Sequence, residues 1–220
     1  MKFINRLSTI VTVLTLTIGA SAHAATALTS TRGTGNQSYT GALGMDFDVN
    51  SAILITSLGA FDSGLDGFNE FGIQVGIFDR GTGFLIGTSA TISGEDPNQG
   101  QSRFVDIDDF VLGPGQYSIV AFGFSSLNQN GNSGLGGSGP TQDTGGGAIS
   151  FIGSGRYDST LSAGFSLPST LDGGPTNRYD AGTFTFTTAV PEPGEWAMML
   201  AGIGMIGLLA RRRKATTSAN

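Results

Sequence analysis

The sequence predicts an all-β protein, an antiparallel β-sandwich or jelly-roll-like domain, followed by one C-terminal transmembrane helix. Three observations support this prediction. Short runs of β-branched and aromatic residues, separated by Gly, Asp and Asn, fill the middle of the chain, a pattern typical of strands and turns. No stretch there keeps a 3.6-residue apolar period beyond about ten residues, so helix is not expected. A long apolar run with a basic end lies near the C-terminus.

The first 24 residues are predicted to be a secretory signal peptide. Lys2 and Arg6 precede a largely apolar stretch, and Ala22-His23-Ala24 places small residues where signal peptidase cuts. We expect cleavage after Ala24, so the mature chain is exported.

Residues 25–189 are predicted to form the β-sandwich. In Thr183–Thr188 the phenylalanines lie on one face of a strand and the threonines on the other. Eight short strands with turn-rich connections indicate an antiparallel sandwich. The predicted strands are Gly44–Val49, Ala52–Phe61, Gly72–Phe78, Phe84–Ile92, Arg103–Leu112, Gln116–Phe124, Gly147–Ile152 and Thr183–Thr188.

A Gly-rich segment at about residues 127–147 interrupts the predicted sandwich. It contains almost no apolar residues, so it buries too little surface to offset the entropy that ordering costs. We predict a flexible surface loop.

The apolar run from Trp196 to Ala210 is the predicted transmembrane helix, residues 196–210. A helix of this length spans about 22 Å, less than the ~30 Å hydrocarbon core. Its flanks nevertheless favour a membrane segment, because an aromatic ring at one end and long basic side chains at the other extend the effective span. The basic residues are Arg211, Arg212, Arg213 and Lys214. They predict a cytoplasmic C-terminus and anchoring in the inner membrane.

The residues before this helix are Val190-Pro191-Glu192-Pro193, where two prolines disfavour helix and leave an extended stretch. Together with the glycine-rich helix and the basic cluster, residues 190–214 resemble the PEP-CTERM sorting signal, also called the ice-binding protein C-terminal domain. The resemblance implies that exosortase, a membrane-embedded cysteine peptidase, recognises Pro191, Glu192 and Pro193 and cleaves nearby. It also implies delivery to the cell surface or exopolysaccharide matrix of a Gram-negative bacterium.

Residues 53–123 resemble a β-rich domain that recurs in exported PEP-CTERM proteins. The resemblance supports the sandwich but implies no activity. The similar stretches are Leu58–Phe68, Val75–Asp79, Gly83–Gly87, Arg103–Val105 and Leu112–Ile119.

The composition of residues 25–190 excludes several classes of function. This part has five arginines and no lysine against fifteen acidic residues, a formal charge of −10, which opposes binding to nucleic acid. It also has no His and no Cys, so Ser-His-Asp and Cys-His catalysis, Schiff-base lysines, the usual zinc sites and disulfides are excluded. We predict no enzyme, no catalytic residue and no cofactor.

One loop is a candidate calcium site. Asp62, Asp66 and Glu70 offer carboxylate oxygens at short spacing, as calcium loops do. Gly64 and Ile73 stand where an EF-hand needs oxygen ligands, however, and the same residues suit a turn between strands. Calcium binding here is therefore the alternative to a simple turn.

Three functions follow from the sequence. The leading hypothesis is a non-enzymatic surface or extracellular-matrix protein that associates with exopolysaccharide. The second is a carbohydrate-binding module, in which the four tyrosines would supply stacking faces, although Trp is absent from the mature domain; they are Tyr39, Tyr117, Tyr157 and Tyr179. The third is a hydrolase that uses two carboxylates, but scattered acids are more simply a soluble surface.

Overall fold

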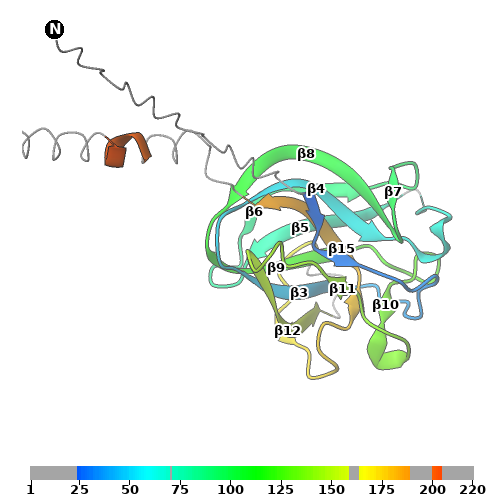
Figure 1. Ribbon diagram of the computed structural model, residues 1–220. Helices are drawn as coiled ribbons and strands as arrows, with labels where there is room; N and C mark the ends of the chain where they lie inside the picture. Colours follow the sequence, from blue (N-terminus) through cyan, green and yellow to red (C-terminus); the bar gives the residue numbers. More distant parts are fainter. Residues whose placement is uncertain (1–23, 70, 159–163, 189–199, 205–220) are drawn as a thin grey trace, which may run out of the picture. The chain divides into compact units, whose positions relative to one another are not determined.

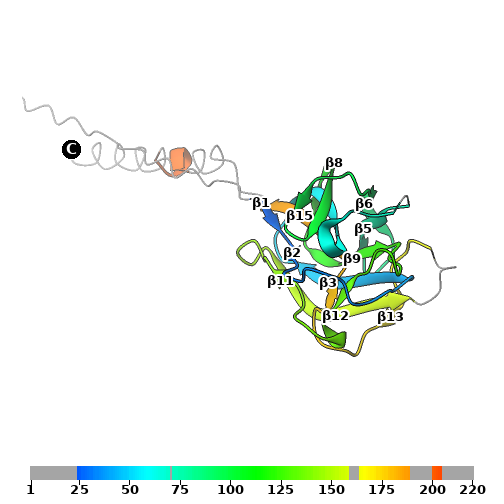
Figure 2. The same cartoon turned by 90° about the vertical axis from the view of Figure 1, so that its right-hand side faces the viewer.

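The computed structural model describes residues 24–69, 71–158, 164–188 and 200–204. Ala22–Ala189 is one compact unit, and its described residues form two facing antiparallel sheets (Figure 1, Figure 2). This confirms the all-β class. The second unit joins Met1–Ser21 with Val190–Asn220, and its described residues, 200–204, are helical.

The five-stranded sheet has the order β1-β15-β4-β8-β7, and the six-stranded sheet has the order β13-β12-β3-β9-β5-β6. The first consists of β1 (Ala24–Thr26), β15 (Gly182–Thr188), β4 (Ile53–Phe61), β8 (Ser102–Leu112) and β7 (Asn98–Gln99). The second consists of β13 (Thr170–Leu171), β12 (Ile149–Asp158), β3 (Ala42–Val49), β9 (Gly115–Phe122), β5 (Ile73–Asp79) and β6 (Leu85–Ile92). Two small ribbons pair β10 (Gly131–Asn132) with β14 (Tyr179–Asp180) and β11 (Thr141–Gln142) with β2 (Leu28–Thr29), and the 3-10 turns are η1 (Ser63–Leu65) and η2 (Ser133–Leu135).

Each of the eight predicted strands corresponds to a long strand of the two sheets. Most boundaries shift by one or two residues. The largest difference is β12, which continues to Asp158 rather than ending at Ile152. Its pairing with β3 shifts register between Phe151 and Gly155, so the alternation of apolar residues stops although the strand continues. The strands of two or three residues are too short to carry a periodic signal, which is why the sequence did not predict them.

Aromatic residues from both sheets meet in the core. Phe47 on β3 and Phe184 on β15 are fully buried, and their ring centroids are 5.1 Å apart. Phe186 is also fully buried, 5.7 Å from Phe184. The phenylalanines of β15 thus face the core, as the alternation predicted, and such ring pairs add about 0.5–1.5 kcal/mol beyond area burial.

The two ends of the sandwich lie next to each other. β1 pairs with β15, so that Ala24 is opposite Thr187 at one edge of the five-stranded sheet. Figure 2 shows this edge, with β1 and β15 side by side. The chain therefore enters and leaves the domain at the same end.

Within the described residues, no helix is long and apolar enough to cross a membrane. Of the predicted transmembrane helix at 196–210, only residues 200–204 are described. That helix stays a prediction.

Candidate functional site

A groove of about 470 Å³ lies on the outer face of the five-stranded sheet. The register places Thr26, Thr185, Ser57 and Asp106 opposite one another on β1, β15, β4 and β8, so these side chains share the face that points away from the core. The groove is lined by Ala24, Thr26, Ser57, Asp96, Pro97, Asn98, Gln99, Phe104, Val105, Asp106 and Thr185.

A β-bulge shapes the floor of the groove. Ile55 and Leu58 are both fully buried, although a regular strand would send residues three apart to opposite faces. The pairing of β4 shifts register between Ile55 and Ser57, so that Thr56 and Ser57 both turn outward, as bulges allow. Their hydroxyls lie 2.7 and 2.5 Å from the Thr185 hydroxyl. The bulge thus creates a cluster of three hydroxyls.

The residues before β8 form one wall of the groove. The Phe104 amide donates to the Pro97 carbonyl at 2.8 Å, and the Gln99 side-chain amide donates to the Thr26 hydroxyl at 3.1 Å. The Phe104 ring lies over Gly59, where a Cβ would approach it to 2.5 Å. A glycine at this position is therefore required for the aromatic ring to pack flat against the sheet.

Every arginine of the sandwich forms an ion pair with an aspartate. In four of the six pairs the carboxylate is buried, with a side chain that is 1% exposed or less. The pairs are Arg32–Asp180, Arg80–Asp46 and Arg80–Asp48, Arg103–Asp62, Arg156–Asp46 and Arg178–Asp172. Asp96 and Asp106, which line the groove, belong to none of them. The arginines of the domain are thus neutralised by its own aspartates. The charged side chains that line the groove are both acidic.

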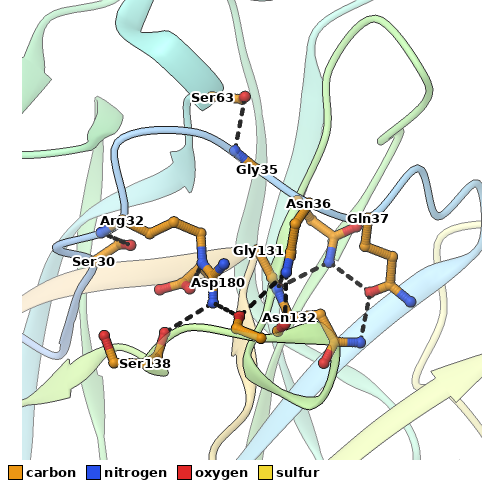
Figure 3. Close-up of polar contacts among 12 residues, drawn as sticks. Ser30, Arg32, Gly35, Asn36, Gln37, Ser63, Gly131, Asn132, Ser138 and Asp180 are labelled. Carbon is orange, nitrogen blue, oxygen red and sulfur yellow. Dashed lines mark hydrogen bonds and ion pairs between the residues drawn. The ribbon is translucent and has the colours of Figure 1, made fainter.

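The segment at 127–147, predicted to be a flexible loop, makes defined polar contacts (Figure 3). Arg32 donates from Nη2 to the carbonyls of Gly136 and Ser138, at 2.9 and 3.0 Å. The side-chain amide of Asn36 donates to the Asn132 carbonyl, and the backbone N–H of Asn132 donates to Asn36 Oδ1. β10, η2 and β11 also lie in this segment. The prediction of a flexible loop rested on the scarcity of apolar residues. Hydrogen bonds rather than apolar contacts hold this segment, and a count of apolar residues does not reveal them.

Asp180 is the buried carboxylate of this network. Burial raises its pKa above the ordinary value, and the Ser30 hydroxyl and the Arg32 guanidinium oppose that shift. Arg32 Nε lies 3.2 Å from Asp180 Oδ2. The network therefore joins the start of the domain to β14 and to the Gly-rich segment.

The loop that contains the candidate calcium site is organised by an arginine. Asp62 is fully buried; its Oδ2 accepts from Arg103 Nε at 2.6 Å and from the Gly67 amide at 3.1 Å. Asp66 is exposed. Within the described residues, no group of three or more His, Cys, Asp or Glu is arranged to hold a metal ion.

Two of the four tyrosines are core residues. Tyr117 is 8% and Tyr179 is 2% exposed, so neither offers an open face for stacking. Tyr39 and Tyr157 are half-buried and pack edge to face, with centroids 6.3 Å apart. The aromatic ring at the groove is Phe104, which the sequence did not single out. The slip in apolar alternation between Ile55 and Leu58 is the sequence signal that could have located the bulge.

The residues predicted for sorting and cleavage lie almost wholly outside the described residues. Ala24 is an exception, as the first residue of β1. The others are Ala22, Pro191, Glu192, Pro193, Trp196, Arg211, Arg212, Arg213 and Lys214.

Comparison with known families identifies the tail. Residues 189–214 match the PEP-CTERM protein-sorting motif, in agreement with the resemblance seen at 190–214. No curated protein and no solved structure matches the chain. The chain therefore carries an exosortase sorting motif, which marks it as an exported protein that exosortase processes.

Proposed function

We propose that the β-sandwich is a non-enzymatic component of the cell surface or extracellular matrix, held in the inner membrane as a precursor and released from its tail by exosortase. The observation that carries this proposal is the position of the sorting motif. β15 ends at Thr188, and the motif begins at residue 189. Cleavage near Pro191 would leave every strand of the two sheets in the product.

The placement of the chain ends supports the same function. Because β1 and β15 pair at one edge, removal of the signal peptide and of the tail would act at one end of the domain. The long loops that follow β4 and β9 would stay untouched. The mature domain also lacks His, Cys and Lys, which supports a non-enzymatic role.

The test compares the mass and location of the protein in cells with and without exosortase. We expect a membrane-bound full-length form without exosortase, and a shorter form at the surface or in the matrix with it. Glu192→Gln should block the shortening, whereas Glu195→Gln, the same change three residues later, should not. An unshortened protein in both strains would refute processing.

A carbohydrate-binding role is the second candidate, because the groove offers a site that the tyrosines do not. Its lining combines carboxylates, amides and hydroxyls with an aromatic ring. A hydrolase that uses Asp96 and Asp106 is the third. Shortening of a bound oligosaccharide during incubation, abolished by Asp106→Asn, would replace the non-enzymatic proposal with that one.

A further inference from the structure

We infer that the groove on the five-stranded sheet binds a neutral oligosaccharide. Its volume of about 470 Å³ lies within the ~300–1,000 Å³ typical of small-ligand sites. The inference rests on the proposed extracellular function, because it assigns the ligand that the exported domain would meet there.

The floor of the groove can exchange hydrogen bonds with hydroxyl groups. Ser57 is only 4% exposed, and its hydroxyl contacts that of Thr185, which in turn contacts Thr56. Such hydroxyls offer more acceptor lone pairs than their mutual contacts use. The bulge holds all three in place before a ligand arrives, so little entropy is lost in ordering them.

The wall and mouth add both donors and acceptors. The amides of Asn98 and Gln99 can donate and accept, and the carboxylates of Asp96 and Asp106 accept. A sugar hydroxyl both donates and accepts, so it can use each of these groups. Phe104 is only 8% exposed, so these polar groups, rather than an aromatic face, would make most of the contacts with a sugar.

The charge of the groove selects against anionic ligands. Two carboxylates and no arginine line it, and each of the five arginines of the domain is paired with an aspartate outside the lining, including Arg103, which also donates to the Asp96 carbonyl. A uronate, a sulfated sugar or a phosphate would therefore meet like charge with no available cation, at a cost in binding free energy. A neutral sugar avoids that cost.

The predicted cleavage of the signal peptide removes only one of the residues that line the groove. Cleavage after Ala24 would remove one apolar lining residue at the edge of the groove. Thr26, the hydroxyl cluster and the wall formed by residues 96–99 would remain.

The test uses the processed protein purified from producing cells. It is applied to an array of neutral, uronate-containing and amino-sugar oligosaccharides, and hits are measured by titration calorimetry. We expect binding to at least one neutral oligosaccharide and none to uronates. Thr185→Val removes one hydroxyl at nearly constant shape and should weaken binding about tenfold. Thr187→Val, on the same face of β15 but outside the groove, should change it less than twofold.

Each other outcome overturns the assignment. These outcomes are no binding to any neutral sugar, preference for uronates or for amino sugars, and equal loss in the two valine variants. Circular dichroism and melting curves of both variants confirm that they fold; should Thr185→Val unfold, Asp106→Asn with Asp108→Asn as its control replaces the pair. A protein that is exported and shortened but binds no sugar refutes the groove assignment alone, whereas failure of export refutes the proposed function itself.

Discussion

Replacing Asp46 with Asn should destabilise the sandwich strongly, because two arginines share its buried carboxylate. Asp46 is fully buried on β3. Arg156 Nε lies 2.8 Å from its Oδ1 and 2.9 Å from its Oδ2, and Arg80 Nη1 lies 3.7 Å from Oδ2. Asparagine keeps the shape of the side chain but removes the charge, which leaves the Arg156 guanidinium largely buried without a counter-ion. Arg80 retains its second partner, Asp48.

The magnitude follows from the geometry. Two unit charges about 4 Å apart interact by roughly 4 kcal/mol at an effective dielectric constant of about 20, but desolvation offsets much of that gain in the intact pair. Removing one partner of a buried pair costs about 3–5 kcal/mol. We expect a value near the lower end, about 3 kcal/mol, because Arg80 keeps Asp48 as a partner and Arg156 alone loses its close contact with Asp46. For a domain of this size the melting temperature should fall by about 6–12 °C.

The assay is urea unfolding followed by far-ultraviolet circular dichroism, because the mature domain has no Trp. Asp108→Asn on β8 makes the same chemical change at an exposed position and should alter the unfolding free energy by no more than about 0.5 kcal/mol. A loss below about 1 kcal/mol for Asp46→Asn, or equal losses for the two variants, would refute the reasoning that a buried ion pair holds β3 to β12.

Two further predictions concern packing and pH. Gly59→Ala should lower the free energy of unfolding by about 1–3 kcal/mol, because the new Cβ would lie 2.5 Å from the Phe104 ring. Gly113→Ala is the control, since a Cβ at that position meets nothing within 4 Å. Equal effects of the two variants in urea unfolding would contradict the prediction. The folded-state pKa of Asp180 is raised by burial, so the folded state holds this proton more tightly and the contribution of Asp180 to stability falls as pH rises above its unfolded pKa of about 3.9. Asp180→Asn should therefore be less destabilising, relative to the native protein, at pH 7 than at pH 4, and the opposite trend would show that Arg32 lowers that pKa instead.

The long strands could be predicted from the sequence because each buries one face of a sheet. Apolar residues then recur at every second position along the strand. In β15 the phenylalanines at 184 and 186 face the core while Thr185 and Thr187 face outward, as that period requires. In β4 the same rule fails between Ile55 and Leu58. A bulge displaces the pattern by one residue there; the slip in alternation marks its position, but the cluster of hydroxyls that it forms with Thr185 depends on the pairing of β4 with β15, which no local pattern specifies.

The ion pairs were not predicted, because all of them except Arg178–Asp172 join residues that are far apart in the chain. Arg32 and Asp180 are separated by 148 positions, and Arg156 and Asp46 by 110. Composition nevertheless held a signal, since every cation of the mature domain is arginine and none is lysine. Arginine is favoured in buried ion pairs because its weakly hydrated, planar guanidinium can make several hydrogen bonds to a carboxylate.

This use of arginine limits how the processed domain could be retained outside the cell. With its cations paired internally and a formal charge of −10 over residues 25–190, the surface repels anionic lipid and acidic polysaccharide alike. Once exosortase has removed the basic tail at residues 211–214, no cluster of positive charge remains in the sequence to replace it. Retention in a matrix must then depend on uncharged contacts. The groove around Ser57 and Thr185 is the described surface that offers them, so binding to a neutral sugar and retention should be lost together in Thr185→Val.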